Sequence, residues 1–146
     1  MVLASLISTA SGTGNVIKLL NNLMFGTLNV IIAEIMALSA KLGLDPKVFY
    51  DTLVQSGVGT VSNLFLEMGP RILSRDFSPL FSIELLHKDM ALGIQMAKKE
   101  EIPLFIIPAA QLLNEIAKSK KLNKEDTSAV VKIYEDLYRV KVKSYK

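Results

Sequence analysis

Hydrophobic positions follow a helical period along almost the whole chain. Between Asn15 and Leu42 apolar residues recur every three or four positions, and no proline interrupts them. Gly43 follows, as a left-handed cap residue would. The pattern predicts one helix over residues 15–42, roughly 40 Å long. Because that length exceeds a small domain, we expect this helix to bridge to another unit.

The next stretch, LDPKVFYDTLVQSG, carries the start and stop signals of a second helix. Asp45 is a good N-cap, Pro46 occupies the first helical position, and Gly57 follows the last one. After it, the residues on either side of Gly69-Pro70 predict two shorter helical pieces.

A third long helix is predicted for FSIELLHKDMALGIQMAKKEEI, which ends before Pro103. Its apolar positions form one face: Ile83, Leu86, Met90, Ile94 and Ala97. Two more helices are expected, one beginning at Pro108 and one capped near Asp126. Since no run of alternating residues predicts strands, the expected fold is all-α.

Composition fits one domain with surface left over for a partner. The chain has 146 residues, of which 50% are hydrophobic and 21% charged. That apolar excess predicts a homo-oligomer or a docking face. The net charge of +3 is concentrated in residues 139–146, which we interpret as a solvated helix end. No basic stripe with interleaved aromatic residues indicates nucleic-acid binding.

Several classes of protein are excluded by what the sequence lacks. It has no cysteine and one histidine, His87, which argues against disulfide frameworks, cysteine catalysis and histidine-rich metal sites. The start, MVLASLISTA, lacks the basic flank of a signal peptide. The apolar stretch 19–40 is interrupted by three asparagines and Glu34, so we expect no membrane span and a cytoplasmic protein.

The stretch SGTGNVIKLLNN (residues 11–22) suggests phosphate binding, but two such interpretations fail. A dinucleotide fingerprint would use Gly12 and Gly14, with MVLASLIS as the strand, but Ile17 stands where the third glycine is needed. No later strands complete the unit. A P-loop requires a Ser or Thr after its lysine, whereas Leu19 follows Lys18.

A third interpretation is a lysine with a polar partner on one helix face. Lys18 and Asn22 are four residues apart, in otherwise apolar surroundings. A partly desolvated lysine can exchange a proton near working pH, and an asparagine one turn further on can hold it or a substrate hydroxyl. From spacing alone, a solvated lysine near a helix start is the commoner case.

The same stretch resembles the G-x-G-x-x-x-K-x-x-N-N segment of the β-hydroxyacid dehydrogenases, such as 3-hydroxyisobutyrate dehydrogenase, tartronate semialdehyde reductase and the glyoxylate and succinic semialdehyde reductases. EIMALSAKLGLDPKVFYDTL, FSIELLHKDMALGIQMAKKEEIPLFIIPAA and DTSAVVKIYE are similar to the later motifs of that family, in order. The resemblance covers roughly residues 12–137, although LNKEDTS departs from the glycine-containing turn of the family.

The resemblance implies a fold with two domains that have different functions. Members have a Rossmann domain that binds NAD or NADP, then an all-α C-terminal domain, of the 6-phosphogluconate dehydrogenase type, entered by a long helix and used for dimer or tetramer contacts. This chain is similar to the second domain only, so residues 1–11 are expected to be a lead-in and residues 12–146 that domain. A small β-hydroxy acid or semialdehyde is the implied substrate.

The resemblance also assigns roles to residues. Lys18 matches the catalytic lysine and Asn22 the asparagine that orients the substrate. Gly12 and Gly14 match a turn before that helix, where a side chain would crowd the ligand. At the other end of the site, the implied cofactor contacts are Lys88, Asp89 and Phe81. His87 matches no such position and is interpreted as a surface or packing residue.

Two hypotheses of different classes follow. In the first, the chain is the lysine-bearing half of such an oxidoreductase, completed by a separate Rossmann-domain chain. Since eleven residues before Gly12 cannot make a nucleotide-binding fold, little or no activity is expected from this chain alone. In the second, it is a non-catalytic helical oligomerisation or interaction domain. Membrane-surface binding through the basic C-terminus is a distant third alternative.

Overall fold

One long helix forms the axis of the domain, and the other helices of the described residues pack around it. The computed structural model describes residues 10–145. Helix α2 (Ala10–Lys41) has 32 residues and is about 48 Å long. The remaining elements, in chain order, are α3 (Pro46–Ser56), α4 (Asn63–Ser74), α5 (Ile83–Lys99), α6 (Ile106–Ser119), the 3₁₀ helix η1 (Thr127–Val130) and α7 (Val131–Tyr138). Residues 10–145 contain no strand, so the all-α prediction is confirmed.

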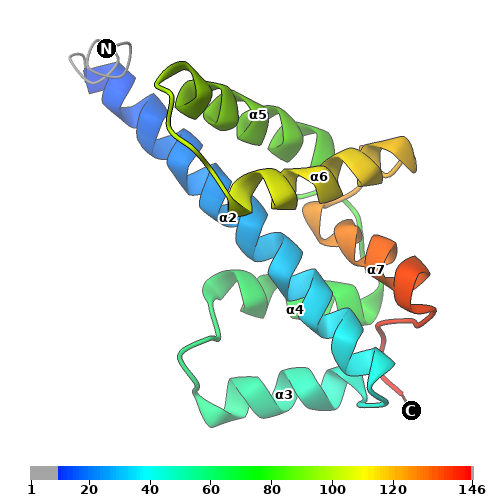
Figure 1. The fold of residues 1–146 in the computed structure, drawn as a ribbon. Helices are drawn as coiled ribbons and strands as arrows, with labels where there is room; N and C mark the ends of the chain where they lie inside the picture. Colours follow the sequence, from blue (N-terminus) through cyan, green and yellow to red (C-terminus); the bar gives the residue numbers. More distant parts are fainter. Residues whose placement is uncertain (1–9, 146) are drawn as a thin grey trace.

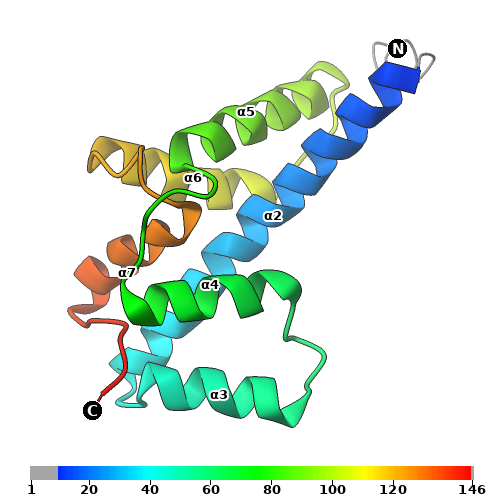
Figure 2. The same ribbon diagram turned by 180° about the vertical axis from the view of Figure 1, so that it is seen from behind.

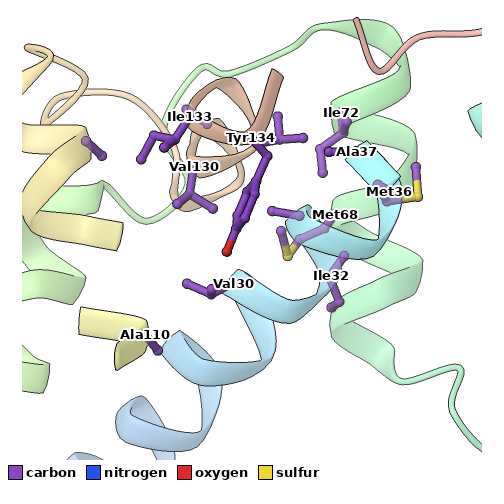
Figure 3. Close-up of a cluster of buried hydrophobic side chains, with 14 of the residues drawn as sticks. Val30, Ile32, Met36, Ala37, Met68, Ile72, Ala110, Val130, Ile133 and Tyr134 are labelled. Atoms are coloured by element: carbon purple, nitrogen blue, oxygen red, sulfur yellow. The ribbon is translucent and has the colours of Figure 1, made fainter. Parts of the chain in front are cut away.

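The helices divide into two groups along α2. Figures 1 and 2 show α5 beside the N-terminal half of α2, with α6 and α7 on the same side, whereas α3 and α4 lie beside its C-terminal half. The main core lies where these groups meet. Figure 3 shows Tyr134 of α7 extending toward α2, among side chains such as Val30, Met68 and Val130.

Helix α2 begins five residues earlier than the sequence pattern predicts. It includes Gly12 and Gly14, which were expected in a turn before the helix. Glycine can adopt helical angles at a cost of up to about 1 kcal/mol, and Gly12 is buried, so packing favours the longer helix. The strand considered for residues 1–8 lies outside the described residues.

By length and composition alone, α2 could cross a membrane over residues 12–41, despite its asparagines and Glu34. However, 56% of its most apolar stretch is buried within the domain. Burial of that kind is expected for the core helix of a globular domain, and the other helices supply the covering surface.

The predicted caps of α3 are confirmed. The Asp45 side chain accepts a hydrogen bond from the Lys47 amide at 2.8 Å, Pro46 is the first helical residue, and Gly57 ends the helix with a left-handed φ of 63°. Pro46 has no amide hydrogen to leave unpaired, and Gly57 adopts positive φ without a steric cost.

The predicted break at Gly69-Pro70 is wrong, because α4 continues through both residues. Proline has no amide hydrogen to donate to the carbonyl four residues earlier, which is that of Leu66. The Tyr50 hydroxyl of α3 donates to that carbonyl at 3.4 Å instead. A Cβ at Gly69 would lie 2.2 Å from Tyr50 Cε2, so the glycine allows this ring to pack against α4.

Helix α5 is shorter at its start than predicted. Its N-cap is Ser82, whose hydroxyl accepts a hydrogen bond from the Leu85 amide, so Phe81 precedes the helix. Lys124 and Asn123 donate to the Glu84 carboxylate and hold the pKa of that group below its usual range. A negative charge in the first turn also suits the positive end of the helix dipole.

The last two helices begin close to their predicted positions. Helix α6 starts two residues before Pro108, which a first helical turn tolerates. Asp126 caps the final helical segment as expected: its carboxylate accepts a hydrogen bond from the Ser128 amide at 3.0 Å. The first turn of that segment is η1, which continues into α7.

The basic side chains Arg139, Lys141 and Lys143 are exposed as expected, but the C-terminal segment is not a helix end and part of it is packed. Helix α7 ends at Tyr138, and Val142 beyond it is fully buried. The Val142 amide donates to the Glu135 carboxylate at 2.8 Å, and Arg75 forms an ion pair with the same carboxylate. Because Glu135 is buried and needs these partners, the segment is held against α7 and α4.

Candidate functional site

The candidate site lies on one face of the N-terminal half of α2. Gly14, Lys18, Asn22 and Phe25 follow one another at helical spacing of four, four and three residues, so they share this face. Helix α5 packs against the same half of α2 (Figures 1 and 2). The two helices therefore bring together residues that are far apart in the sequence.

A buried hydrogen bond joins the two helices at the site. The Asn22 side-chain nitrogen donates to Asp89 Oδ2 at 2.7 Å, and both residues are buried. Because a carboxylate only accepts hydrogen bonds, it fixes the amide with its nitrogen toward Asp89 and its oxygen away from it. Asn22 Oδ1 is thus left as an oriented acceptor one turn from Lys18.

Close approach of α2 and α5 depends on two glycines. A Cβ at Gly93 of α5 would lie 2.9 Å from the Leu23 side chain of α2. A Cβ at Gly26 of α2 would lie 2.2 Å from Met90 Sδ of α5. These two contacts set the spacing of the helices on either side of the Asn22–Asp89 bond.

Phe81 reaches the site by packing on Phe25. The two rings meet edge to face, with centroids 5.7 Å apart. The segment before α5 is held by Asp126, whose Oδ2 accepts hydrogen bonds from the amides of Leu80 at 3.1 Å and Phe81 at 3.3 Å. The Thr127 amide in turn donates to the Phe81 carbonyl at 2.9 Å.

Unlike Asn22 and Asp89, the two lysines predicted for the site are not held by partners within the domain. Lys18 and Lys88 are both exposed, and neither makes a hydrogen bond or ion pair within residues 10–145. The described residues therefore show the solvated Lys18 that spacing alone favoured, and they do not supply the partly desolvated surroundings of the other interpretation. Lys88 follows His87 and precedes the buried Asp89 on α5, so the helix presents its cation to solvent beside the site.

The remaining predicted residues have clear positions. Gly14 is exposed one turn before Lys18, and a Cβ there would meet nothing within 4 Å in this chain. The crowding expected at Gly14 was that of a bound ligand, and the described residues leave this position open. His87 lies between α5 and α6, with Nδ1 3.3 Å from Lys118 Nζ and Nε2 3.7 Å from Glu115.

Three contributors were not found by sequence reasoning: Phe25, Gly26 and Gly93. Phe25 lies on the same helix face as Lys18 and could have been found from its seven-residue spacing. A glycine inside a helix costs up to about 1 kcal/mol relative to alanine, which signals a close approach. That signal is present at Gly26 and Gly93, but their partners lie more than sixty residues away in the sequence.

Sequence comparison relates the whole domain to dehydrogenases. A family model described as the NAD-binding domain of NADP-dependent 3-hydroxyisobutyrate dehydrogenase matches residues 12–134. The 2-(hydroxymethyl)glutarate dehydrogenase of Eubacterium barkeri is 32% identical over 132 residues, which are 90% of this chain and 44% of that protein. The L-threonate dehydrogenase of Cupriavidus necator is 32% identical over 128 residues, 88% of this chain and 42% of the relative.

Solved structures of 3-hydroxyisobutyrate dehydrogenases have a similar fold. The 3-hydroxyisobutyrate dehydrogenase of Salmonella typhimurium superimposes with a TM-score of 0.77 and 29% identity, over 85% of this chain and 42% of that one. The Mycobacterium tuberculosis 3-hydroxyisobutyrate dehydrogenase shares the fold, with a TM-score of 0.74.

The fold and the family match define a helical dehydrogenase domain. The chain belongs to the β-hydroxyacid dehydrogenase family and corresponds to the C-terminal region of its members. It spans less than half the length of the curated relatives cited above.

Proposed function

We propose that the chain is the lysine-bearing half of an NAD(P)-dependent oxidoreductase acting on a small β-hydroxy acid or semialdehyde. The observation that supports this most directly is the buried Asn22–Asp89 hydrogen bond, which orients an amide oxygen one turn from Lys18. Family membership supplies the class of reaction, and the names of the relatives suggest a hydroxy-acid substrate.

In this proposal each residue has a distinct task. Lys18 Nζ hydrogen-bonds to the reacting oxygen of the substrate and takes or returns its proton. Asn22 Oδ1 accepts a hydrogen bond from the Lys18 ammonium or from a substrate hydroxyl other than the reacting one, and Asp89 is the positioning residue that holds the amide. The nicotinamide would supply the hydride chemistry when bound.

The described residues fit only one edge of a cofactor site. Lys88 offers an exposed cation beside Asp89, suited to a phosphate or ribose oxygen, and the Phe81 ring lies nearby through Phe25. Residues 10–145 contain no strand, and hence no nucleotide-binding sheet. We therefore propose that a Rossmann domain completes the site, covers Lys18, and is required for turnover.

A complementation assay tests this proposal. The 146-residue chain is mixed with the nucleotide-binding domain of the Eubacterium barkeri relative, or fused behind it, and oxidation of β-hydroxy acids is followed by nicotinamide absorbance. Turnover should require both parts.

Lys18→Ala should reduce kcat by about 10²–10⁴-fold, as expected for loss of a positioned acid or base. Lys99→Ala, an exposed lysine of α5, is the matched control. Full activity of Lys18→Ala would disprove the assigned role.

Cofactor binding can be measured separately. We expect NADH or NADPH fluorescence titrations of the completed protein to show weaker binding in Lys88→Ala and unchanged binding in Lys99→Ala. Equal affinity of the two variants would remove Lys88 from the site.

A second candidate is a helical oligomerisation domain that retains the family fold without chemistry. The observation favouring it is the number of large apolar side chains exposed along α2. This alternative predicts a stable dimer or tetramer that is indifferent to Lys18→Ala and Asn22→Ala, and no turnover in the complementation assay.

A further inference from the structure

The main chain of Phe81 is held on both sides by two consecutive residues of another segment. Asp126 Oδ2 accepts a hydrogen bond from the Phe81 amide at 3.3 Å, and the Thr127 amide donates to the Phe81 carbonyl at 2.9 Å. Asp126 and Thr127 are both buried, and we call this pair the Phe81 clamp. Because both polar groups of the Phe81 main chain are paired with the clamp, the clamp determines where Phe81 lies.

Asn29 joins the Phe81 clamp to helix α2. Its side-chain nitrogen donates to the Thr127 carbonyl at 2.9 Å, across 98 residues of sequence, and Asn29 is fully buried. Four residues follow one stripe of α2 at spacings of four, three and four: Lys18, Asn22, Phe25 and Asn29. One helix therefore carries both the residues proposed to act on the substrate and the residue that holds the clamp.

The contacts form a closed circuit that begins and ends on α2. The Phe81 ring meets the Phe25 ring edge to face, and the Phe81 main chain is bonded to the clamp. The clamp is bonded in turn to Asn29, one turn after Phe25. Phe81 is thus fixed at its ring and at its main chain relative to the helix that carries Lys18. Its side chain is only half-buried, so part of the ring can meet a ligand.

Asn29 is an unfavourable residue at this position if its only role is stability. Its Oδ1 atom is buried and has no hydrogen-bond partner among the described residues. A buried polar atom without a partner lowers stability, and such atoms are rare in folded proteins. Conflicts of this kind are expected at functional sites, where the position of a group matters more than the stability of the fold.

The two oxygens of the Asp126 carboxylate have different tasks. Oδ1 accepts hydrogen bonds from the Ser128 amide at 3.0 Å and hydroxyl at 2.6 Å, and so caps η1. Arg71 of α4 brings its Nε to 3.7 Å from the same oxygen. Oδ2 accepts from the amides of Leu80 and Phe81. Capping explains the bonds of Oδ1 but not those of Oδ2, which go to the segment that carries Phe81.

We propose that Asn29 and Asp126 are positioning residues for the nicotinamide edge of the site. They fix Phe81 relative to Lys18, and the position of the Phe81 ring sets the affinity for NADH or NADPH. Both side chains are buried, so each acts through Phe81 and not by touching the ligand. This inference rests on the proposed function, which places Phe81 at the cofactor.

Steady-state kinetics of the completed protein tests the role of Asn29. Asn29→Leu removes one unpaired buried oxygen and leaves the Thr127 carbonyl without its donor, so the midpoint of urea unfolding should change little. The KM for the nicotinamide cofactor should nevertheless rise about tenfold, a factor typical of one lost hydrogen bond. Because Lys18 and Asn22 are untouched, kcat should stay within about twofold of the wild type. An unchanged KM would overturn the proposal.

Two buried carboxylates separate positioning from stability. Asp126→Ala and Glu135→Ala each remove an acidic side chain that accepts a hydrogen bond from a main-chain amide, so both should lower the urea midpoint. Glu135 makes its hydrogen bonds with other segments, to Arg75, Lys141 and Val142. Only Asp126→Ala should therefore raise the cofactor KM. Equal changes in KM for the two variants would leave Asp126 with a structural role alone.

A double-mutant cycle shows whether Asn29 acts through Phe81. Phe81→Leu should itself weaken cofactor binding in fluorescence titrations, and adding Asn29→Leu should weaken it no further. Additive effects would mean that Asn29 acts elsewhere, which also overturns the proposal. Failure of the proposed function is a distinct result, because the completed wild-type protein would then show neither turnover nor cofactor binding, and this inference would fail with it.

Discussion

Asn22 and Asp89 form the contact on which the candidate site depends. Sequence spacing placed Asn22 one turn from Lys18, and resemblance placed Asp89 near the site, but neither showed that the two residues bond. Their separation of 67 residues is bridged by the packing of α2 on α5, which no local pattern encodes. A partly desolvated Lys18 was one interpretation, but the side chain is exposed within residues 10–145, as spacing alone favoured.

Replacing Asp89 with alanine should leave the buried Asn22 nitrogen without an acceptor. We expect the free energy of unfolding to fall by about 1–3 kcal/mol, measured by urea denaturation. Asp89→Asn retains an acceptor oxygen and should lose less. If both variants unfold at the wild-type midpoint, the hydrogen bond does not hold Asn22 in solution.

Tyr134 should make stability fall at high pH. Burial raises the pKa of its hydroxyl above the ordinary value of 10.0, and the nearby Glu34 carboxylate adds to the effect. Since the folded-state pKa is above the unfolded value, the favourable contribution is present below pH 10 and is lost as pH rises beyond it. Tyr134→Phe should cost about 1 kcal/mol at pH 7 and flatten this alkaline decline. An unchanged decline in the variant would assign it to other groups.

Among the elements, the ends of α3 could be predicted from local sequence, whereas the continuity of α4 could not. The caps of α3 are local interactions between Asp45, Pro46 and Gly57, and they were predicted correctly. The continuity of α4 depends on Tyr50, which lies 16 residues before Leu66 and 19 before Gly69. The early start of α2 was also missed. Gly12 and Gly14 were interpreted as part of a turn, but both lie within the helix.

Gly69→Ala should destabilise the α3–α4 pair. The new Cβ would meet the Tyr50 ring, and we expect a loss of about 1–3 kcal/mol in chemical denaturation, typical of overpacking. Tyr50→Ala should largely abolish this difference when it is combined with Gly69→Ala.

Gly14→Ala is the matched control, since open space surrounds Gly14 in a helical position. It should stabilise the chain by about 0.5–1 kcal/mol. Equal effects of the two glycine substitutions would contradict the tight packing of Tyr50 on Gly69.

For the molecule as a whole, the fold class and the order of helices were predictable, because apolar period and proline positions are local signals. The position of the C-terminal segment was not. Its basic residues suggested solvation, yet Val142 is buried and the Tyr145 amide donates to Asp45 at 2.9 Å. This segment contains both basic and apolar residues, so tertiary contacts decide its position. These contacts are the hydrogen bonds to Glu135 and to Asp45 at the start of α3.

Truncation after Arg139 should therefore weaken the whole domain. Loss of the buried Val142 side chain alone should cost about 1.5–3 kcal/mol, measured as a lower midpoint in urea. Lys143→Ala, an exposed residue of the same segment, should unfold like the wild type. A truncated chain as stable as the full one would mean that the segment is not packed in solution.

The central position of α2 also has a consequence during synthesis. Within this domain, α2 leaves the ribosome before the other described helices, whereas α7, which covers part of its core face, leaves after them. While the rest of the domain is being synthesised, the apolar side chains of α2 are therefore exposed on the nascent chain. Exposed apolar surface of this kind promotes aggregation and chaperone binding. Yield in cells should consequently depend on chaperone supply more strongly than the stability of the finished domain would suggest.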